Sequence, residues 1–256
     1  MEVTHLRAPN PGRFTLTGTN TWIVGRDPAY VIDPGPAHRG HIAALAEAVT
    51  DRGGLGAIAL THDHHDHAAG VDPLSARLPA PVAAARGDVD LTLRDGDELG
   101  PLTVIATPGH TPDHLAFLCE QTCFTGDAVL GTGSVFIAPT PGAMSGYLEA
   151  LRRLRALDLE QLCPGHGPVI DDPAAWLDTY IAHRLEREER LIAALGDGLR
   201  STNELLRRVW DDAPTALRVA ASMTLEAHLA KLDEEGLLPE GVERQRFSWL
   251  RRLRVI

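Results

Sequence analysis

The sequence predicts a mixed α/β fold that gathers metal-binding side chains at the ends of its strands. Short apolar runs alternate along the 256 residues with segments whose apolar residues recur at helical spacing, a pattern typical of α/β proteins. Several of the apolar runs are followed within a few residues by Gly or Pro and then by His or Asp. Four of the 12 histidines fall between positions 62 and 67, and this density requires a chemical explanation.

This dense cluster reads His-Asp-His-His-Asp-His, residues 62–67. Neutral imidazole and carboxylate are the ligands that zinc and similar divalent ions prefer. The cluster follows residues 55–61, an apolar run without polar alternation, as in a buried strand, and precedes residues 68–70, which suit a helix start. We therefore expect a strand-to-helix loop on which several side chains converge.

Three later residues of ligand type also follow apolar runs. They are His110 after residues 102–106, Asp127 after residues 123–125, and His166 after residues 159–163. Strand ends are where an α/β scaffold presents side chains to a site. A solvated histidine loop or a metal-storage tract would not need such partners spread over about a hundred residues, so the pattern favours one composite metal site.

The remaining elements follow in chain order. Residues 14–25 and 30–33 predict two strands, and residues 39–49 predict an amphipathic helix that packs on the sheet. Residues 82–85 and 91–93 predict further short strands, as do the runs before His110, Asp127 and His166 and residues 115–119. Residues 146–157 predict a helix. The Gly-rich stretch after Asp127 predicts a loop that holds substrate.

The composition changes after Pro173. Helices are expected at 174–195, 199–209 and 217–232, followed by strands at 237–238 and 247–256, which is the order of a winged-helix module. We therefore expect a catalytic domain at 1–182 and a winged-helix-like domain at 183–256. The expected recognition helix carries only Arg218 and Lys231 as bases, so a lid or substrate-binding wall is favoured over DNA binding.

Net charge and cysteine content restrict the classes of function. The formal charge of −11 disfavours a broad nucleic-acid or anionic-membrane surface. No apolar run approaches the roughly 20 residues needed to span a bilayer, and the first residues lack the pattern of a secretory signal, so we expect a cytoplasmic protein without membrane contact. Three cysteines argue against a disulfide framework, and we expect Cys119, Cys123 and Cys163 to be packed thiols.

The ordered set of ligand types resembles that of the metallo-β-lactamase-fold hydrolases. The set comprises His62, His64, Asp66, His67, His110, Asp127 and His166. Five further stretches resemble one branch of that superfamily, the beta-lactamase-like protein 2 group: residues 18–22, 107–114, 126–133, 164–170 and 183–188. The resemblance implies a four-layer αββα sandwich with the site at one edge, followed by a C-terminal winged helix.

The resemblance also implies how the ligands are divided. His62, His64 and His110 would hold one metal ion, Asp66, His67 and His166 would hold a second, and Asp127 would bridge both. Zinc is the default, although the same residues accept iron or manganese. A hydroxide shared by the two ions would attack a carbonyl or a phosphorus atom. His65 falls outside the pattern and is expected at the surface or behind the ligands.

Other residues receive supporting roles. Asp66 is also expected to orient the hydroxide or relay its proton, and Asp33 to fix a ligand imidazole. His114 would contact substrate or donate a proton to the leaving group, or would simply bond to a neighbouring loop. The expected substrate side comprises Asn20, Tyr147, His183 and Arg184, with helix packing or a salt bridge an equal alternative for the last two.

The sequence therefore predicts a metal-dependent hydrolase with a dinuclear site. Its acidic core favours an acyl ester or thioester, either a small molecule or carrier-bound, over single-stranded RNA cleaved by an endoribonuclease. A third alternative, from a different class, is a non-catalytic winged-helix regulator that binds nucleic acid. The oligomeric state is open, and a homodimer is one arrangement that the sequence allows.

Overall fold

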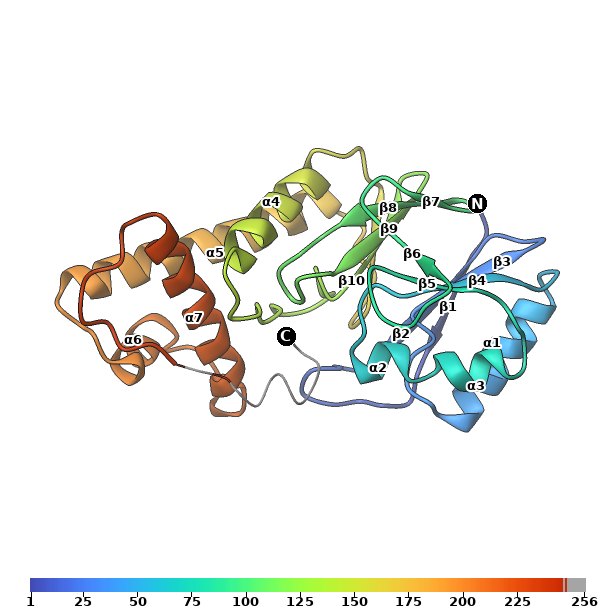
Figure 1. The fold of residues 1–256 in the computed structure, drawn as a ribbon, viewed down its shortest axis with the longest axis horizontal. Helices are drawn as coiled ribbons and strands as arrows, with labels where there is room; N and C mark the ends of the chain where they lie inside the picture. The colour runs from blue at the N-terminus through green and yellow to red at the C-terminus, as the bar shows by residue number, and fades with distance from the viewer. Residues whose placement is uncertain (246, 248–256) are drawn as a thin grey trace. The chain divides into compact units, whose positions relative to one another are not determined.

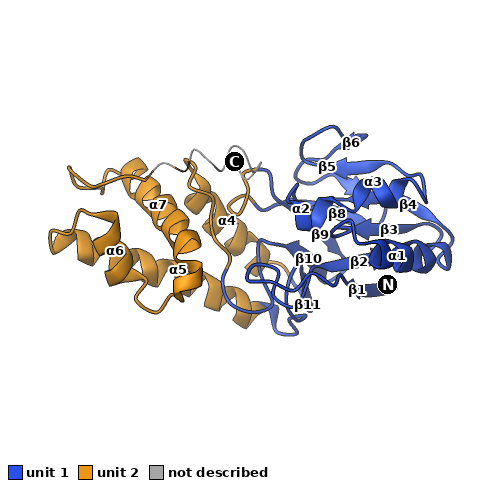
Figure 2. Cartoon of the chain, turned by 90° about the horizontal axis from the view of Figure 1, so that it is seen from below, with its two compact units in different colours: residues 1–107, 113–134, 158–173 blue, residues 108–112, 135–157, 174–256 orange. Residues whose placement is uncertain are grey.

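Figure 1 shows the computed structural model of the chain, which describes residues 1–245 and 247. The contacts divide the chain into two compact units (Figure 2). The first comprises residues 1–107, 113–134 and 158–173, and the second comprises residues 108–112, 135–157 and 174–256. The expected boundary between residues 182 and 183 falls inside the continuous helix α5 (Pro173–Gly196). The residue ranges of the two units therefore differ from those of the two expected domains.

Both sheets belong to the first unit. The six-stranded sheet has the order β1-β2-β3-β4-β5-β6, with β1 to β3 antiparallel and β3 to β6 parallel. Its strands are β1 (Val3–Arg7), β2 (Asn20–Val24), β3 (Ala29–Ile32), β4 (Leu55–Ala59), β5 (Val82–Ala84) and β6 (Leu91–Thr92).

The five-stranded sheet has the order β11-β10-β9-β8-β7. Its strands are β7 (Glu98–Leu99), β8 (Leu102–Ala106), β9 (Leu115–Cys119), β10 (Thr122–Gly126) and β11 (Gln161–Pro164). Strands β10 and β11 are parallel, and the other pairs are antiparallel. Parallel strands end at the same edge of a sheet, and this places the residues after β10 and β11 side by side.

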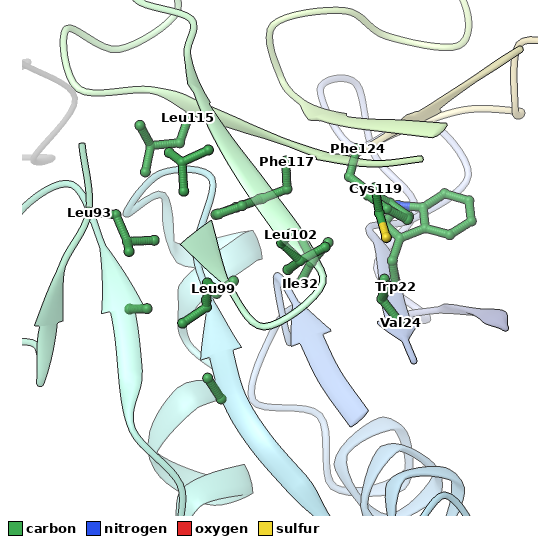
Figure 3. Packing of buried hydrophobic residues seen from close by; sticks show 14 of the residues in the cluster. Trp22, Val24, Ile32, Leu93, Leu99, Leu102, Leu115, Phe117, Cys119 and Phe124 are labelled. Carbon is green, nitrogen blue, oxygen red and sulfur yellow. The ribbon is translucent and has the colours of Figure 1, made fainter. Parts of the chain in front are cut away.

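The two sheets pack face to face through a shared apolar core (Figure 3). Trp22 of β2 lies in this core with its ring centroid 5.8 Å from that of Phe124. Its neighbour Ile23 points to the opposite face, where the apolar side of α1 (Arg39–Thr50) packs, because side chains alternate along a strand. The sheet is thus buried on both faces, which explains apolar runs without polar alternation.

These layers confirm the mixed α/β fold with two sheets and helices. A helical layer, a sheet and a second sheet lie within the first unit. The fourth layer of the expected sandwich stays a prediction, because the remaining long helices belong to the second unit. Two short helices, α2 (His65–Ala68) and α3 (Val71–Ser75), follow β4, so the helix begins inside the ligand cluster and not after it.

In the part of the chain that the structure describes, the second unit is built on four helices and a short 3-10 turn. These are α4 (Ala143–Arg155), α5, α6 (Thr202–Val209), the turn η1 (Thr215–Leu217) and α7 (Arg218–Glu234). Leu191, Leu205 and Leu225 join α5, α6 and α7 in one apolar core. The expected helices are present, but residues 237–238 form no strand, and the last expected strand lies outside the described residues apart from Phe247. The winged-helix form therefore remains a prediction. None of the described helices meets the length and hydropathy that a membrane span requires.

Candidate metal centre

The candidate ligands of the first unit lie where the two sheets are joined by hydrogen bonds. The Leu115 amide at the start of β9 donates to the Thr61 carbonyl just after β4, at 2.8 Å. The Asn20 amide at the start of β2 donates to the Gly165 carbonyl just after β11, at 2.7 Å. The loops that carry the clustered histidines, Asp127 and His166 therefore open at a common edge.

One group of possible ligands consists of Asp66, His67 and His166. Their nearest ligand atoms lie within 4.8 Å of one another. The two Nε2 atoms of His67 and His166 are 3.1 Å apart, and Asp66 Oδ2 lies 3.1 Å from the Nε2 of His166. Both imidazoles are buried and are therefore shielded from bulk water.

The hydrogen bonds of the outer nitrogens show that this group suits a cation. His67 Nδ1 donates to Asp33 Oδ2 at 2.8 Å, and His166 Nδ1 faces the Gly18 carbonyl at 3.4 Å. Carboxylate and carbonyl oxygens only accept, so each Nδ1 carries a proton and each Nε2 is the nitrogen that faces the site. Two imidazole nitrogens and a carboxylate that converge in a buried place need positive charge among them, which protons supply without metal and a divalent ion would supply in their place. This donor set fits a divalent metal ion.

A second group contains His62, His64 and Asp127, again with ligand atoms within 4.8 Å of one another. His62 Nε2 lies 2.9 Å from His64 Nδ1, and His62 Nδ1 lies 2.9 Å from the Thr61 hydroxyl. The Thr61 hydroxyl donates to Asp33, so it accepts the proton of His62 Nδ1. Nε2 of His62 therefore also points its lone pair into the site.

Asp127 lies between the two groups. Its Oδ1 is 3.5 Å from His67 Nε2 and 3.4 Å from His166 Nε2, although Asp127 also belongs to the group of His62 and His64. One carboxylate within reach of both groups can contribute an oxygen to each of two ions.

Asp33 forms hydrogen bonds that reach a histidine in each of the two groups, directly or through Thr61. Its Oδ2 accepts from His67 Nδ1 and from the Thr61 hydroxyl, and its Oδ1 accepts from the Thr61 amide at 2.8 Å. The side chain is buried, and the backbone has φ of +50°, a conformation that Asp adopts more readily than most residues. Asp33 thus lies where a residue that orients imidazoles is expected.

The pKa shifts express the same convergence of charge. Burial lowers the pKa of His67, but the carboxylates of Asp127 and Asp33 outweigh burial and raise it well above its ordinary value. Burial likewise raises the pKa of Asp66, yet the hydrogen bond with His166 and the charge of His67 lower it to about 2. Asp66 is therefore ionised at neutral pH and is available as a ligand.

His110 lies on residues 108–112, which belong to the second unit although Thr107 and Asp113 on either side belong to the first. Its Nδ1 is 3.2 Å from the Phe136 carbonyl, and its ring centroid is 4.6 Å from that of Phe136. The side chain is buried, and Nδ1 donates because a carbonyl only accepts. Nε2 is left as its possible ligand atom.

His114 contacts the loop that carries a ligand. Its Nε2 accepts from the Asp127 amide at 3.1 Å, and its Nδ1 lies 2.8 Å from the Thr107 hydroxyl. Both nitrogens are thus engaged in a buried side chain. The arrangement favours bonding to a neighbouring loop, the second of the two roles expected for His114, over proton donation.

Asn20, expected on the substrate side, instead holds the loop of His166. It is 1% exposed, and its Nδ2 donates to the carbonyls of Pro164 and Gly167, both at 2.9 Å. Its Oδ1 lies 2.8 Å from the Nε2 of His5. A side chain with these partners has no face directed to a substrate.

The other three residues of the expected substrate side belong to the second unit, and two of them are buried there. Tyr147 is 0% exposed and Arg184 is 2% exposed, with the guanidinium 5.4 Å from the Tyr147 ring centroid. Burial raises the pKa of Tyr147 to about 12. His183 is half-buried and accepts from Arg187 Nε at 3.3 Å, so the helix-packing alternative applies to it. Burial, with the charges of Arg184 and Arg187, lowers the pKa of His183 to about 4.

Sequence reasoning did not single out Thr61 or Thr107. Each is the polar residue that ends an apolar run next to a ligand loop, and each hydroxyl contacts a histidine ring. A polar residue between an apolar run and a ligand loop was the sequence feature from which both threonines could have been identified. His65 is exposed, as expected for a surface residue, and the three cysteines are free and buried.

Comparison with known proteins adds a family to this geometry. The model of the Metallo-beta-lactamase superfamily matches residues 14–100 and 87–166. A relative from Caenorhabditis elegans, named Beta-lactamase-like protein 2 homolog, is 32% identical over 97% of this chain and 89% of its own. An atrochrysone carboxyl ACP thioesterase from Aspergillus chevalieri is 34% identical over 75% of this chain and 65% of its own.

Solved structures agree with these relatives. A metallo-beta-lactamase family protein from Thermus thermophilus superimposes with a TM-score of 0.74 at 25% identity and covers 91% of this chain and 94% of its own. Another structure, of a protein in a di-iron-bound form, has a TM-score of 0.55 at 28% identity and covers 67% of this chain and 96% of its own. A protein similar to this chain thus holds iron.

Proposed function

Because this chain belongs to the metallo-beta-lactamase superfamily, we propose that it is a dinuclear metal-dependent hydrolase that cleaves acyl thioesters. Asp127 carries the proposal, since its Oδ1 is within 3.5 Å of His67 Nε2 and 3.4 Å of His166 Nε2 while its carboxylate is also grouped with His62 and His64. When bound, two divalent ions supply the Lewis acidity that activates water near neutral pH and stabilises a developing oxyanion.

The protein's own residues hold and orient the reacting groups. In this proposal His62, His64 and His110 form one set of ligands, Asp66, His67 and His166 form the other, and Asp127 serves both. Asp33 fixes the imidazoles of His67 and, through Thr61, of His62, so that both Nε2 atoms would be available to hold ions. Asp66, ionised at neutral pH, is placed to accept the proton of the attacking water.

The substrate class rests on the named relatives and on charge. The relative from Aspergillus chevalieri is named as a thioesterase that acts on an acyl carrier protein, and this chain carries a formal charge of −11. An acidic surface repels the RNA backbone and leaves a neutral thioester unaffected. We therefore propose an acyl thioester, carried on a small thiol or on a carrier protein, as the substrate.

The regulator alternative has less support. All residues of α7 from Ala221 to Leu229 are buried, so this helix offers no exposed face there for a major groove. In our proposal the C-terminal helices serve substrate or ligand positioning.

The proposal is tested by assaying acyl thioesters, acyl esters and a fluorescent single-stranded RNA side by side with metal-loaded protein. Thiol release from the thioesters is expected, and Asp127→Ala should lower it by at least about 100-fold because a shared ligand is lost. The matched control is Asp72→Asn, which changes an exposed carboxylate and should keep the wild-type rate. RNA cleavage without thioester hydrolysis would overturn the substrate class, and undiminished turnover by Asp127→Ala would overturn the metal assignment.

A further inference from the structure

The segment that carries His110 belongs by its contacts to the second unit. Residues 108–112 are grouped with that unit, although the chain enters and leaves them from the first unit. The Gly109 carbonyl accepts from the Ala138 amide at 2.9 Å, and His110 Nδ1 donates to the Phe136 carbonyl at 3.2 Å. This second bond selects the tautomer in which His110 Nε2 keeps its lone pair.

The loop of residues 135–138 is in turn held by the helices α5 and α7. Arg184 of α5 donates from Nη2 to the Val135 carbonyl at 2.5 Å. The Thr224 hydroxyl of α7 accepts from the Ile137 amide at 3.3 Å. Residues of this loop therefore alternate in their contacts: residues 135 and 137 contact the helices, and residues 136 and 138 contact the His110 segment.

Tyr147 closes the same arrangement. Gly109 has φ of +145°, and a Cβ added to it would lie 2.6 Å from the Cβ of Tyr147, so the segment is pressed against that side chain. The guanidinium of Arg184 lies over the ring of the same tyrosine, 5.4 Å from the ring centroid. Arg184 is 2% exposed and thus has little freedom to adopt another rotamer.

We propose that Arg184 is a positioning residue: by holding the Val135 carbonyl it keeps the Phe136 carbonyl in place, and this carbonyl fixes the ring orientation and tautomer of His110. The inference rests on the proposed function in taking His110 as a metal ligand. It assigns to the helical unit the placement of one ligand, so that a change at Arg184 of α5 would alter the orientation of His110 through residues 135–138. A ligand imidazole that loses its outer hydrogen bond typically costs about 10- to 100-fold in metal affinity.

Arg187 provides a matched control one turn along the same helix. It too is buried, it too donates to a backbone carbonyl, that of Val209, and its guanidinium lies 5.7 Å from the ring centroid of Trp210. It therefore has the same residue type, helix, kind of acceptor and aromatic neighbour as Arg184. Its acceptors are the Val209 carbonyl of α6, Asp212 and His183, and none of these three belongs to the loop of residues 135–138.

The test compares Arg184→Met with Arg187→Met by long-range ¹H–¹⁵N NMR of the histidine rings in the metal-free protein. His110 is assigned through the resonance that His110→Asn removes. Wild type and Arg187→Met should show His110 protonated at Nδ1, whereas Arg184→Met should show a mixture of tautomers. Arg184→Lys, which keeps a donor, should restore part of the wild-type signal.

Metal affinity, measured by competition with a chelator, gives the second readout. Arg184→Met should lose about 10- to 100-fold for one of two ions, and Arg187→Met should stay within about twofold of wild type. Should Arg184→Met fail to fold, Thr224→Val, which removes the acceptor of the Ile137 amide, should shift the same tautomer. An unchanged His110 tautomer in these variants would overturn the inference even where His110→Asn weakens metal binding. Unchanged metal binding in His110→Asn would instead overturn the proposed ligand set.

Discussion

At the scale of single residues, the most informative finding is that one buried carboxylate orients imidazoles from both ligand groups. Asp33 accepts from His67 Nδ1 directly and from the Thr61 hydroxyl, which in turn contacts His62 Nδ1. Loss of this carboxylate would remove the hydrogen bonds that orient the rings of His67 and His62. The orientation of these two ligands therefore depends on Asp33, which is not itself a proposed ligand.

Asp33→Asn tests this dependence. The amide keeps the size of the side chain but replaces one accepting oxygen by a donor, which cannot accept from His67 or from Thr61. We expect affinity for metal ions to fall by about 10- to 100-fold, measured by competition with a chelator. Asp72→Asn is the control, since Asp72 is exposed. Equal affinities for the two variants would show that Asp33 does not orient the ligands.

Sequence reasoning found the possible ligands more readily than their surroundings. A run of His and Asp at strand ends signals metal chemistry through residue type alone. The role of Asn20 depends on carbonyls 144 and 147 positions away, and that of Arg184 on a carbonyl 49 positions away. Polarity marked these residues as notable, but such distant backbone partners leave no local pattern.

At the scale of secondary-structure elements, the strands that form apolar runs were predictable, whereas the edge strands β1 and β7 were not. The runs that became β4, β8 and β9 are apolar because residues on both sides of each strand are buried or half-buried. Strand β1 is partly exposed and interrupted by polar residues, and β7 has only two residues, so neither carries an apolar run. Residues 14–19 were expected to be extended, yet β2 begins only at Asn20.

The turn after β11 shows how tightly one element limits the site. A Cβ on Gly165 would lie 2.7 Å from His67 Cε1 and 2.9 Å from Asp127 Oδ1. Gly165→Ala should therefore displace a ligand from each group and lower metal affinity by at least about tenfold, as measured by calorimetry. Gly196→Ala, where a Cβ meets nothing within 4 Å, is the control. Wild-type affinity in Gly165→Ala would mean that the turn can move without cost.

At the scale of the whole molecule, the chain divides by contacts and not by a single cut. The expected cut between residues 182 and 183 followed a change in composition, but α5 crosses it, and residues 108–112 join the helical unit. Such an exchange of segments depends on tertiary contacts, which composition does not record. It also places the candidate ligand His110 in the same unit as α6 and α7.

The helical unit should make stability depend on pH. Burial, with the charges of Arg184 and Arg187, lowers the pKa of His183 to about 4, so the folded state binds this proton only near pH 4. The unfolded state binds it from about pH 6.5 downward. The free energy of unfolding should thus fall as pH drops from about 6.5 toward 4 and be unaffected by this group above about pH 7.

Urea unfolding of metal-free protein across this range checks the dependence, because bound metal would add its own pH dependence. His183→Gln should show a shallower decline of the unfolding free energy with falling pH than wild type. Parallel curves for the two proteins would show that His183 does not link protons to folding.

The central claim is that two ions held by the His and Asp groups perform the hydrolysis. The most direct measurement is the rate of acyl thioester hydrolysis while metal-free protein is titrated with zinc, iron(II) or manganese. The account predicts no hydrolysis without metal and a rate that reaches its plateau at about two equivalents of the active ion. Full activity of the metal-free protein, or a plateau at one equivalent, would contradict it.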